Sequence, residues 1–116
     1  MTKEFVKIED LKFIEHPSNK NVKIGYILTH KDDNVDFTSA IVKIPKGQSI
    51  PEHTHNVYDI ICPLSGKGTI WVENAGECEL KKGVFVKVPP HTKHKIYNVE
   101  YHPTLTITIN SMTFTT

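Results

Sequence analysis

The sequence predicts an all-β protein built as a single domain, from two features of its composition and one of its patterning. Val, Ile and Thr account for 35 of the 116 residues, whereas Leu occurs five times and Ala twice. β-branched side chains lose rotamer freedom in a helix and pack well on a pleated sheet, so this balance favours strands. Turn residues recur roughly every 8 to 12 positions between short apolar runs, as in a sandwich or barrel. A chain of 116 residues buries one core of this kind and has little room for a second.

Short runs with alternating apolar residues mark the expected strands. Residues 104–109 alternate threonine and aliphatic side chains without exception, which gives this strand one polar and one apolar face. Residues 60–64 and 69–73 flank a glycine-rich turn at 65–68 and are expected to form a hairpin. Residues 5–14 fit one or two short strands, or an arm that reaches a partner subunit. The remaining strands are expected at residues 22–28, 37–44, 78–80, 84–88 and 94–98.

Charge and hydropathy narrow the classes of partner. The formal net charge is +1 and the 23% of charged residues are of both signs, interspersed, so no basic surface indicates nucleic acid. The N-terminus lacks the apolar stretch of a secretory signal, and no apolar run approaches the roughly twenty residues that span a bilayer. We therefore expect a cytoplasmic protein that binds a small molecule and no nucleic acid or membrane. Cys62 and Cys78 should stay thiols in that compartment, with a disulfide as the less favoured alternative.

The stretch 47–66 holds the strongest functional signal. His53 and His55 are separated by one residue in a region rich in β-branched residues, and side chains two apart on a strand point to the same face. Asp59 has the same parity, although a turn or bulge before it would change its aim. His94 lies about forty residues further along, so it joins them only if the fold brings distant strands together. Three imidazoles and one carboxylate suit a divalent first-row metal ion (Zn, Fe, Mn, Ni, Co or Cu) with an open coordination position.

The motifs around these residues resemble those of the cupin superfamily. In cupins a Gly precedes a His-x-His pair, a Glu and a second Gly, and a second motif runs Gly, Pro-x-Gly, His and Asn. Asp59 and His91 stand where glutamate and glycine are expected, and the other eight motif positions match within residues 47–98. The matching residues are Gly47, His53, His55, Gly66, Gly83, Pro89, His94 and Asn98.

The resemblance implies a jelly-roll barrel of antiparallel strands, also called a double-stranded β-helix, with residues 1–116 forming one cupin domain. It implies a metal ion inside the barrel, held by His53, His55, Asp59 and His94. It also implies a homodimer in which N-terminal strands, here residues 1–14, contribute to the interface.

Asp59 leaves three interpretations open. Aspartate is one methylene shorter than glutamate, and metal–oxygen bonds must stay near about 2.0 to 2.2 Å. Either the backbone adjusts so that Asp59 binds the ion, or Asp59 binds through a water molecule, or it orients an imidazole without touching the metal. A site of three histidines survives any of these.

The remaining candidates are expected to have structural roles. His91 should be a solvated loop histidine, with contact to a substrate at the mouth of the barrel as the alternative. Asn98 lies near a strand end and should make a structural hydrogen bond. A lone histidine is more often a hydrogen-bonded polar residue than a ligand, and we expect this of His16, His30 and His102.

Three functional hypotheses follow from this site. The first is a metal-dependent enzyme that acts on a small oxygenated metabolite, either as a sugar or keto-acid isomerase, epimerase or lyase, or as a dioxygenase. The second is a non-catalytic barrel that senses or stores a small ligand. The third is a metal-free carbohydrate-binding or epimerase barrel with a histidine base, which the complete histidine set disfavours. Fold does not determine reaction, and we favour the first hypothesis without assigning catalytic residues.

Overall fold

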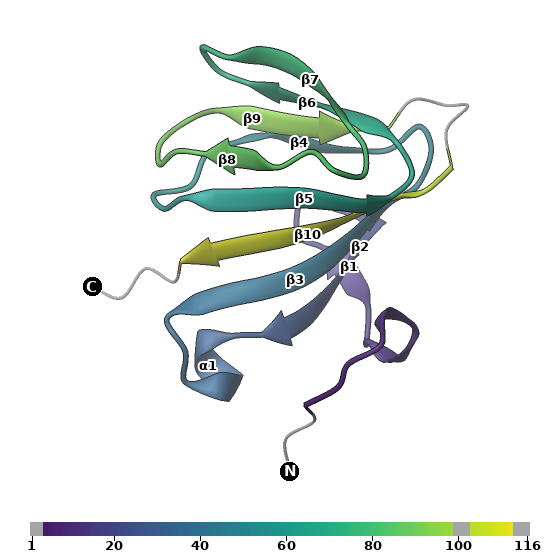
Figure 1. The fold of residues 1–116 in the computed structure, drawn as a ribbon, viewed down its shortest axis with the longest axis vertical. Coiled ribbons are helices and arrows are strands. Elements are labelled where there is room, and N and C mark those ends of the chain that lie inside the picture. Colours follow the sequence, from purple (N-terminus) through teal and green to yellow (C-terminus); the bar gives the residue numbers. More distant parts are fainter. Residues whose placement is uncertain (1–3, 99–102, 113–116) are drawn as a thin grey trace.

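The chain folds into two antiparallel β-sheets that lie one over the other (Figure 1). The computed structural model describes residues 4–98 and 103–112, and strands account for most of them. None of the helices in these ranges is long and apolar enough to span a membrane. The elements are, in chain order, the 3-10 turn η1 (Ile8–Asp10), β1 (Ile14–His16), β2 (Asn19–Leu28), α1 (His30–Asp33), β3 (Phe37–Ile44), β4 (Ser49–His53), β5 (Asp59–Ser65), β6 (Gly68–Val72), β7 (Gly76–Leu80), β8 (Val86–Val88), β9 (His94–Tyr97) and β10 (Leu105–Met112).

The strand order confirms the all-β class and corrects the predicted barrel. One sheet has six strands in the order β1-β2-β3-β10-β5-β8, and the other has four in the order β4-β9-β6-β7. Neighbouring strands pair antiparallel throughout. Among the described residues no strand pairs from one sheet into the other, so the sheets face each other without closing into a barrel. The edge strands of the six-stranded sheet, β1 and β8, have three residues each, so few of their backbone groups are free to pair with a strand of the other sheet.

The expected hairpin around residues 65–68 is a crossover between the sheets. β5 belongs to the six-stranded sheet and β6 to the four-stranded sheet. Gly66 has a φ of +79°, a conformation that glycine adopts without strain, and a Cβ at this position would overlap the main-chain carbonyl of Thr104. The turn residues indicated correctly that the chain reverses, but a local pattern does not determine which strand each arm pairs with. The hairpin forms one turn later, where β6 pairs with β7.

The core fills the space between the two sheets. On β10, Leu105 and Ile107 are fully buried, whereas the hydroxyl of Thr108 on the opposite face donates a hydrogen bond to the carbonyl of Cys62. This alternation directs aliphatic side chains of both sheets toward each other, and burying each of them contributes roughly 1.5–3 kcal/mol. The buried cluster comprises Val22, Ile24, Ala40, Val42, Ile44, Ile50, Ile61, Ile70, Val72, Leu80, Val88, Ile96, Leu105 and Ile107.

The segment before β2 packs against the six-stranded sheet. Leu11 and Phe13 cover Gly25 of β2, where a Cβ would lie only 3.1 Å from the Phe13 ring. The Lys43 ammonium lies 4.4 Å from the centroid of the same ring and makes a cation–π contact with it. This part of the predicted arm therefore contacts the chain's own sheet, whereas Phe5 is 92% exposed.

The two cysteines are free, as predicted. Cys62 lies on β5 of the six-stranded sheet, and Cys78 lies on β7 of the four-stranded sheet.

Candidate metal centre

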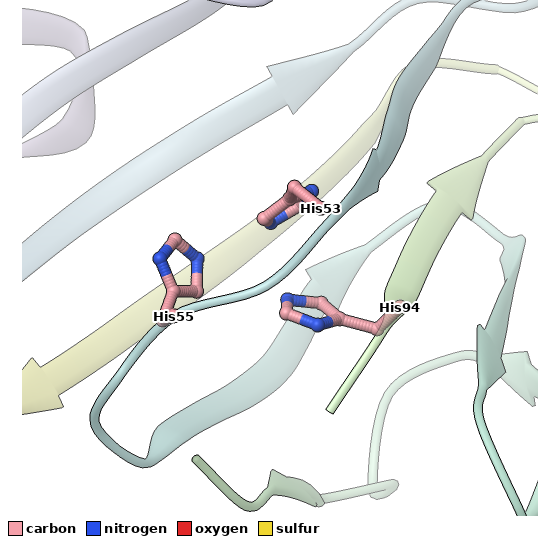
Figure 2. A group of neighbouring side chains, drawn as sticks. All are labelled: His53, His55 and His94. Carbon is pink, nitrogen blue, oxygen red and sulfur yellow. The ribbon is translucent and has the colours of Figure 1, made fainter. Parts of the chain in front are cut away.

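Three histidines converge between strand ends: His53, His55 and His94 (Figure 2). His53 is the last residue of β4 and His94 the first of β9, and the two face each other as register partners on adjacent strands. His55 follows two residues beyond the end of β4. The nitrogen atoms that the three side chains offer as ligands all lie within 4.8 Å of one another. The structure therefore brings the three predicted histidines together in a group that can hold a metal ion.

His55 reaches the group by a route that strand alternation did not predict. β4 ends at His53, and its pairing with β9 shifts register between Ile50 and His53, so His55 does not share a strand face with His53. The loop position of His55 is instead fixed by its own carbonyl, which accepts a hydrogen bond of 2.6 Å from the backbone N–H of His91. Asp59 then opens β5 in the other sheet. The candidate residues consequently come from both sheets and the loop between them.

Backbone carbonyls set the tautomers of His53 and His94. The Nδ1 of His53 lies 2.7 Å from the carbonyl oxygen of Pro51, and the Nδ1 of His94 lies 2.9 Å from that of Thr92. A carbonyl only accepts, so each Nδ1 carries the proton and each neutral ring keeps its lone pair on Nε2. Such second contacts orient the imidazoles that ligate metals in proteins.

The Nε2 of His94 is the strongest sign that the group fits a metal ion. His94 is 1% exposed, and its Nε2 is buried without a hydrogen-bond partner in the described part of the chain. A buried acceptor left unpaired costs about 1–3 kcal/mol. A divalent cation at this point would satisfy the lone pair, and imidazole is a common ligand for first-row metals.

Asp59 supplies a carboxylate beside two of the three rings. Its Oδ2 lies 3.1 Å from the Nε2 of His55 and 3.7 Å from the Nε2 of His94, and the residue is 4% exposed. Burial alone would raise the pKa of Asp59, but opposing interactions, of which the hydrogen bond from His55 is the largest, hold this pKa at about 2. Asp59 is therefore an ionised group next to the histidines, although the cluster of mutually close ligand atoms contains only the three imidazoles.

The pKa values of His53 and His55 shift in opposite directions. Burial lowers the pKa of His53, which keeps that ring neutral near pH 7. The hydrogen bond to Asp59 raises the pKa of His55 against the opposing effect of burial. A metal ion that binds Nε2 of His55 must therefore displace the proton shared with Asp59.

His91 serves the site through its backbone. Its side chain is exposed, as predicted for a solvated loop histidine, and its φ of 59° is left-handed. Glycine adopts such a conformation without strain, which agrees with the glycine expected at this position from the cupin motif. The N–H that His91 donates to His55 joins the loop before β9 to the loop after β4.

The histidine cluster opens onto a cavity of about 370 Å³, which Asp59 also lines. Aliphatic side chains from both sheets form much of its wall, and His16 lies on the wall as well. Sequence reasoning expected no ligand role for His16, because nothing in its local pattern indicates that the β1–β2 turn folds over the cavity. Of the other two histidines expected to be structural, the Nδ1 of His30 lies 2.9 Å from the carbonyl of Val35, and His102 lies outside the described residues.

Asn98 has the predicted structural role. Its side-chain amide donates hydrogen bonds of 3.0 Å to the carbonyl of Ile44 and 2.8 Å to that of Pro103. Its backbone N–H also donates to the carbonyl of Gln48. These bonds tie the end of β9 to the segments that lead into β4 and β10.

Solved structures with the same fold share little sequence with this chain. The polyketide cyclase RemF from Streptomyces resistomycificus is 17% identical, with a TM-score of 0.83 over 96% of this chain and 80% of that protein. A predicted oxalate decarboxylase from Thermotoga maritima is 19% identical, with a TM-score of 0.80 over 95% of this chain and 99% of that one. KdgF from Halomonas sp. is 19% identical, with a TM-score of 0.74 over 97% and 96% of the two chains. These similarities show a common fold.

The sequence itself establishes the family. No curated protein sequence matches the chain. The model of the cupin domain, in contrast, matches residues 40–110, a range that includes the three histidines and Asp59. The match spans more than half of the sequence and agrees with the motif residues, and the chain therefore belongs to the cupin domain family.

Proposed function

We propose that this chain is a metal-dependent enzyme that acts on a small oxygenated metabolite. In this proposal His53, His55 and His94 hold a divalent first-row ion, one of Zn, Fe, Mn, Ni, Co or Cu. The observation that carries it is the proximity of the three imidazoles, with the buried Nε2 of His94 lacking a hydrogen-bond partner among the described residues.

We also propose Asp59 as the fourth ligand. Its Oδ2 approaches the Nε2 atoms of both His55 and His94, so its position at the start of β5 offsets the methylene that it lacks relative to glutamate. Ionisation at neutral pH, which follows from its pKa of about 2, suits a carboxylate that binds a cation.

When bound, the ion would supply Lewis acidity for an isomerase, epimerase or lyase, or dioxygen activation if it were iron or manganese. The protein's own contribution is positional. The Pro51 and Thr92 carbonyls orient two imidazoles, and aliphatic side chains line much of the cavity next to them. Two structural neighbours, a polyketide cyclase and a predicted oxalate decarboxylase, bear enzyme names, which agrees with this proposal.

A non-catalytic protein that binds a small ligand between its two sheets is the second candidate. The observation that favours it is the weak basicity of Asp59, whose pKa of about 2 makes it a poor proton acceptor at neutral pH. Turnover of any bound metabolite by the metal-loaded protein would decide for the enzyme.

Assembly and location stay predictions. The cupin resemblance implies a homodimer with residues 1–14 at its interface, and light scattering of the purified protein would count the copies. The expected cytoplasmic location is likewise open to direct measurement.

Metal content tests the proposal directly. Protein purified without added metal should contain up to one first-row ion per chain, or take up one ion in a titration, as measured by elemental analysis and calorimetry. Occupancy should fall below about pH 6 because imidazoles must lose their protons to bind metal. His55 should protonate before His53 as the pH falls, because the pKa of His55 is raised and that of His53 is lowered. A chain that neither contains nor takes up metal would exclude the proposed function.

The role of Asp59 is tested by Asp59→Ala. As a ligand, Asp59 should contribute more than a group that only orients an imidazole, so we expect zinc affinity to fall by more than about 100-fold. A loss of about 10 to 100-fold would indicate an orienting role instead. Glu52→Ala is the matched control, since Glu52 is an exposed carboxylate next to His53. Unchanged affinity in Asp59→Ala would remove Asp59 from the site.

A further inference from the structure

The cavity beside the histidines has little positive charge of its own. Of the residues that the structure describes, no lysine lines it, and the whole chain contains no arginine. Proteins recognise phosphates and carboxylates chiefly with these two side chains. A divalent ion next to the ionised Asp59 would leave a net charge of +1, enough to neutralise one negative charge. A second buried anionic group on a ligand would stay unpaired, which is costly.

The cavity wall is largely apolar. Both sheets contribute to it, and its volume of about 370 Å³ lies in the range of small-molecule sites. Thr38, Thr54 and Ser111 also line the cavity and carry uncharged hydroxyl groups. The aliphatic side chains on the wall are Ile24, Ala40, Ile50, Ile61, Ile96 and Ile109.

His16 places a hydrogen-bond donor on this wall. Its Nδ1 lies 3.1 Å from the backbone nitrogen of Ser18 and accepts its hydrogen, so the proton of the neutral ring is on Nε2. Within residues 4–98 and 103–112, that Nε2 makes no hydrogen bond to another protein group. Burial, and next the charge of His55, lower the pKa of His16, so the ring is neutral near pH 7 and acts as a donor without charge.

The turn that carries His16 is held in place from the opposite sheet. Asn19, the first residue of β2, donates hydrogen bonds from its side chain to the carbonyl of Ser49, at 2.7 Å, and to the side chain of Gln48, at 3.2 Å. His16 is thus a fixed part of the cavity. It also lies outside residues 40–110, the range that matches the cupin domain.

We propose that the cavity binds a small, largely apolar molecule that carries at most one negative charge, at the metal, and accepts a hydrogen bond from His16. This proposal rests on the proposed metal site and names the class of its substrate. Phosphorylated sugars and dicarboxylates fall outside the class. Esters, ketones and enols with an apolar body fall within it.

The test compares two probes on the zinc-loaded protein by calorimetry. Ethyl benzoylacetate is uncharged and offers several oxygen atoms, whereas phenylmalonate carries the same phenyl group on a dianion. We expect the ester to bind at least about tenfold more tightly, because the second carboxylate of phenylmalonate finds no cation in the cavity. Zinc content is measured on every sample, before and after the titration.

Variants of His16 test its hydrogen bond. His16→Ala should weaken binding of the ester by roughly fivefold to tenfold, the effect of one hydrogen bond, and leave zinc affinity unchanged. His16→Gln retains a donor and should restore part of the loss. His30→Ala is the control, because His30 is an exposed histidine on α1 that does not line the cavity.

The outcomes separate the substrate class from the metal site. Zinc uptake together with equal or tighter binding of phenylmalonate would overturn the proposed class and leave the metal site standing. Ester affinity that is the same in His16→Ala as in the unmodified chain would overturn the role of His16. A chain that takes up no zinc would overturn the proposed function and this inference together.

Discussion

Replacement of His94 by alanine is expected to abolish metal binding at physiological concentrations. His94 is the most deeply buried of the three imidazoles, and its Nε2 makes no hydrogen bond in the described structure. Loss of groups that only orient a ligand costs about 10 to 100-fold in affinity, so loss of the ligand itself should cost more than about 100-fold. Zinc affinity measured by competition with a chromophoric chelator gives this number, and circular dichroism shows whether the variant keeps its sheets.

His91→Ala provides the comparison for His94→Ala. His91 lies three residues before His94, but its side chain is exposed and only its backbone contacts the site. Its zinc affinity should match that of the unmodified chain. Equal affinities in His94→Ala and the unmodified chain would mean that the converging imidazoles do not form the metal site.

The second large effect is expected from Gly66→Ala, at the crossover between the sheets. The φ of +79° costs a residue with a Cβ about 1–2 kcal/mol, and the overlap with the Thr104 carbonyl adds about 1–3 kcal/mol. The Cα of Leu105 lies 3.0 Å from the same Cβ position, so the main chain on both sides would have to move. The free energy of unfolding should therefore fall by about 2–5 kcal/mol, as measured by urea denaturation.

Gly76→Ala separates backbone strain from steric overlap. Gly76 has a similar φ of +88°, but a Cβ there would meet nothing within 4 Å. Only the conformational cost of about 1–2 kcal/mol should appear. If the two variants lose the same stability, the close approach between Gly66 and the segment before β10 does not determine the fold at this turn.

The strands and the histidine group were predictable because the information for them is local. Residues 37–44 carry a run of apolar and β-branched side chains between turn residues, and the observed strand β3 has the same bounds. The two cupin motifs likewise keep their spacing in the sequence. They identify His53, His55 and His94 without any knowledge of how the strands pair.

Features that depend on contacts between distant residues could not be predicted in this way. The turn at 65–68 reads as a hairpin because nothing near it indicates that β6 pairs with β7 and β9 instead of β5. The path of His55 depends on a hydrogen bond from His91, far along the chain. The position of His16 on the cavity wall depends on contacts that Asn19 makes with the opposite sheet. Each of these is a long-range interaction with no local signature.

The pairing of His53 with His94 has a consequence for the unfolded chain. These residues face each other on adjacent strands although about forty residues separate them in sequence, so one ion bound to both would act as a cross-link that closes a long loop. This cross-link does not form in the denatured ensemble, where the two imidazoles are rarely near each other. Binding of one ion by both histidines would then favour the native topology directly, and the melting temperature of the protein would depend on the concentration of free metal.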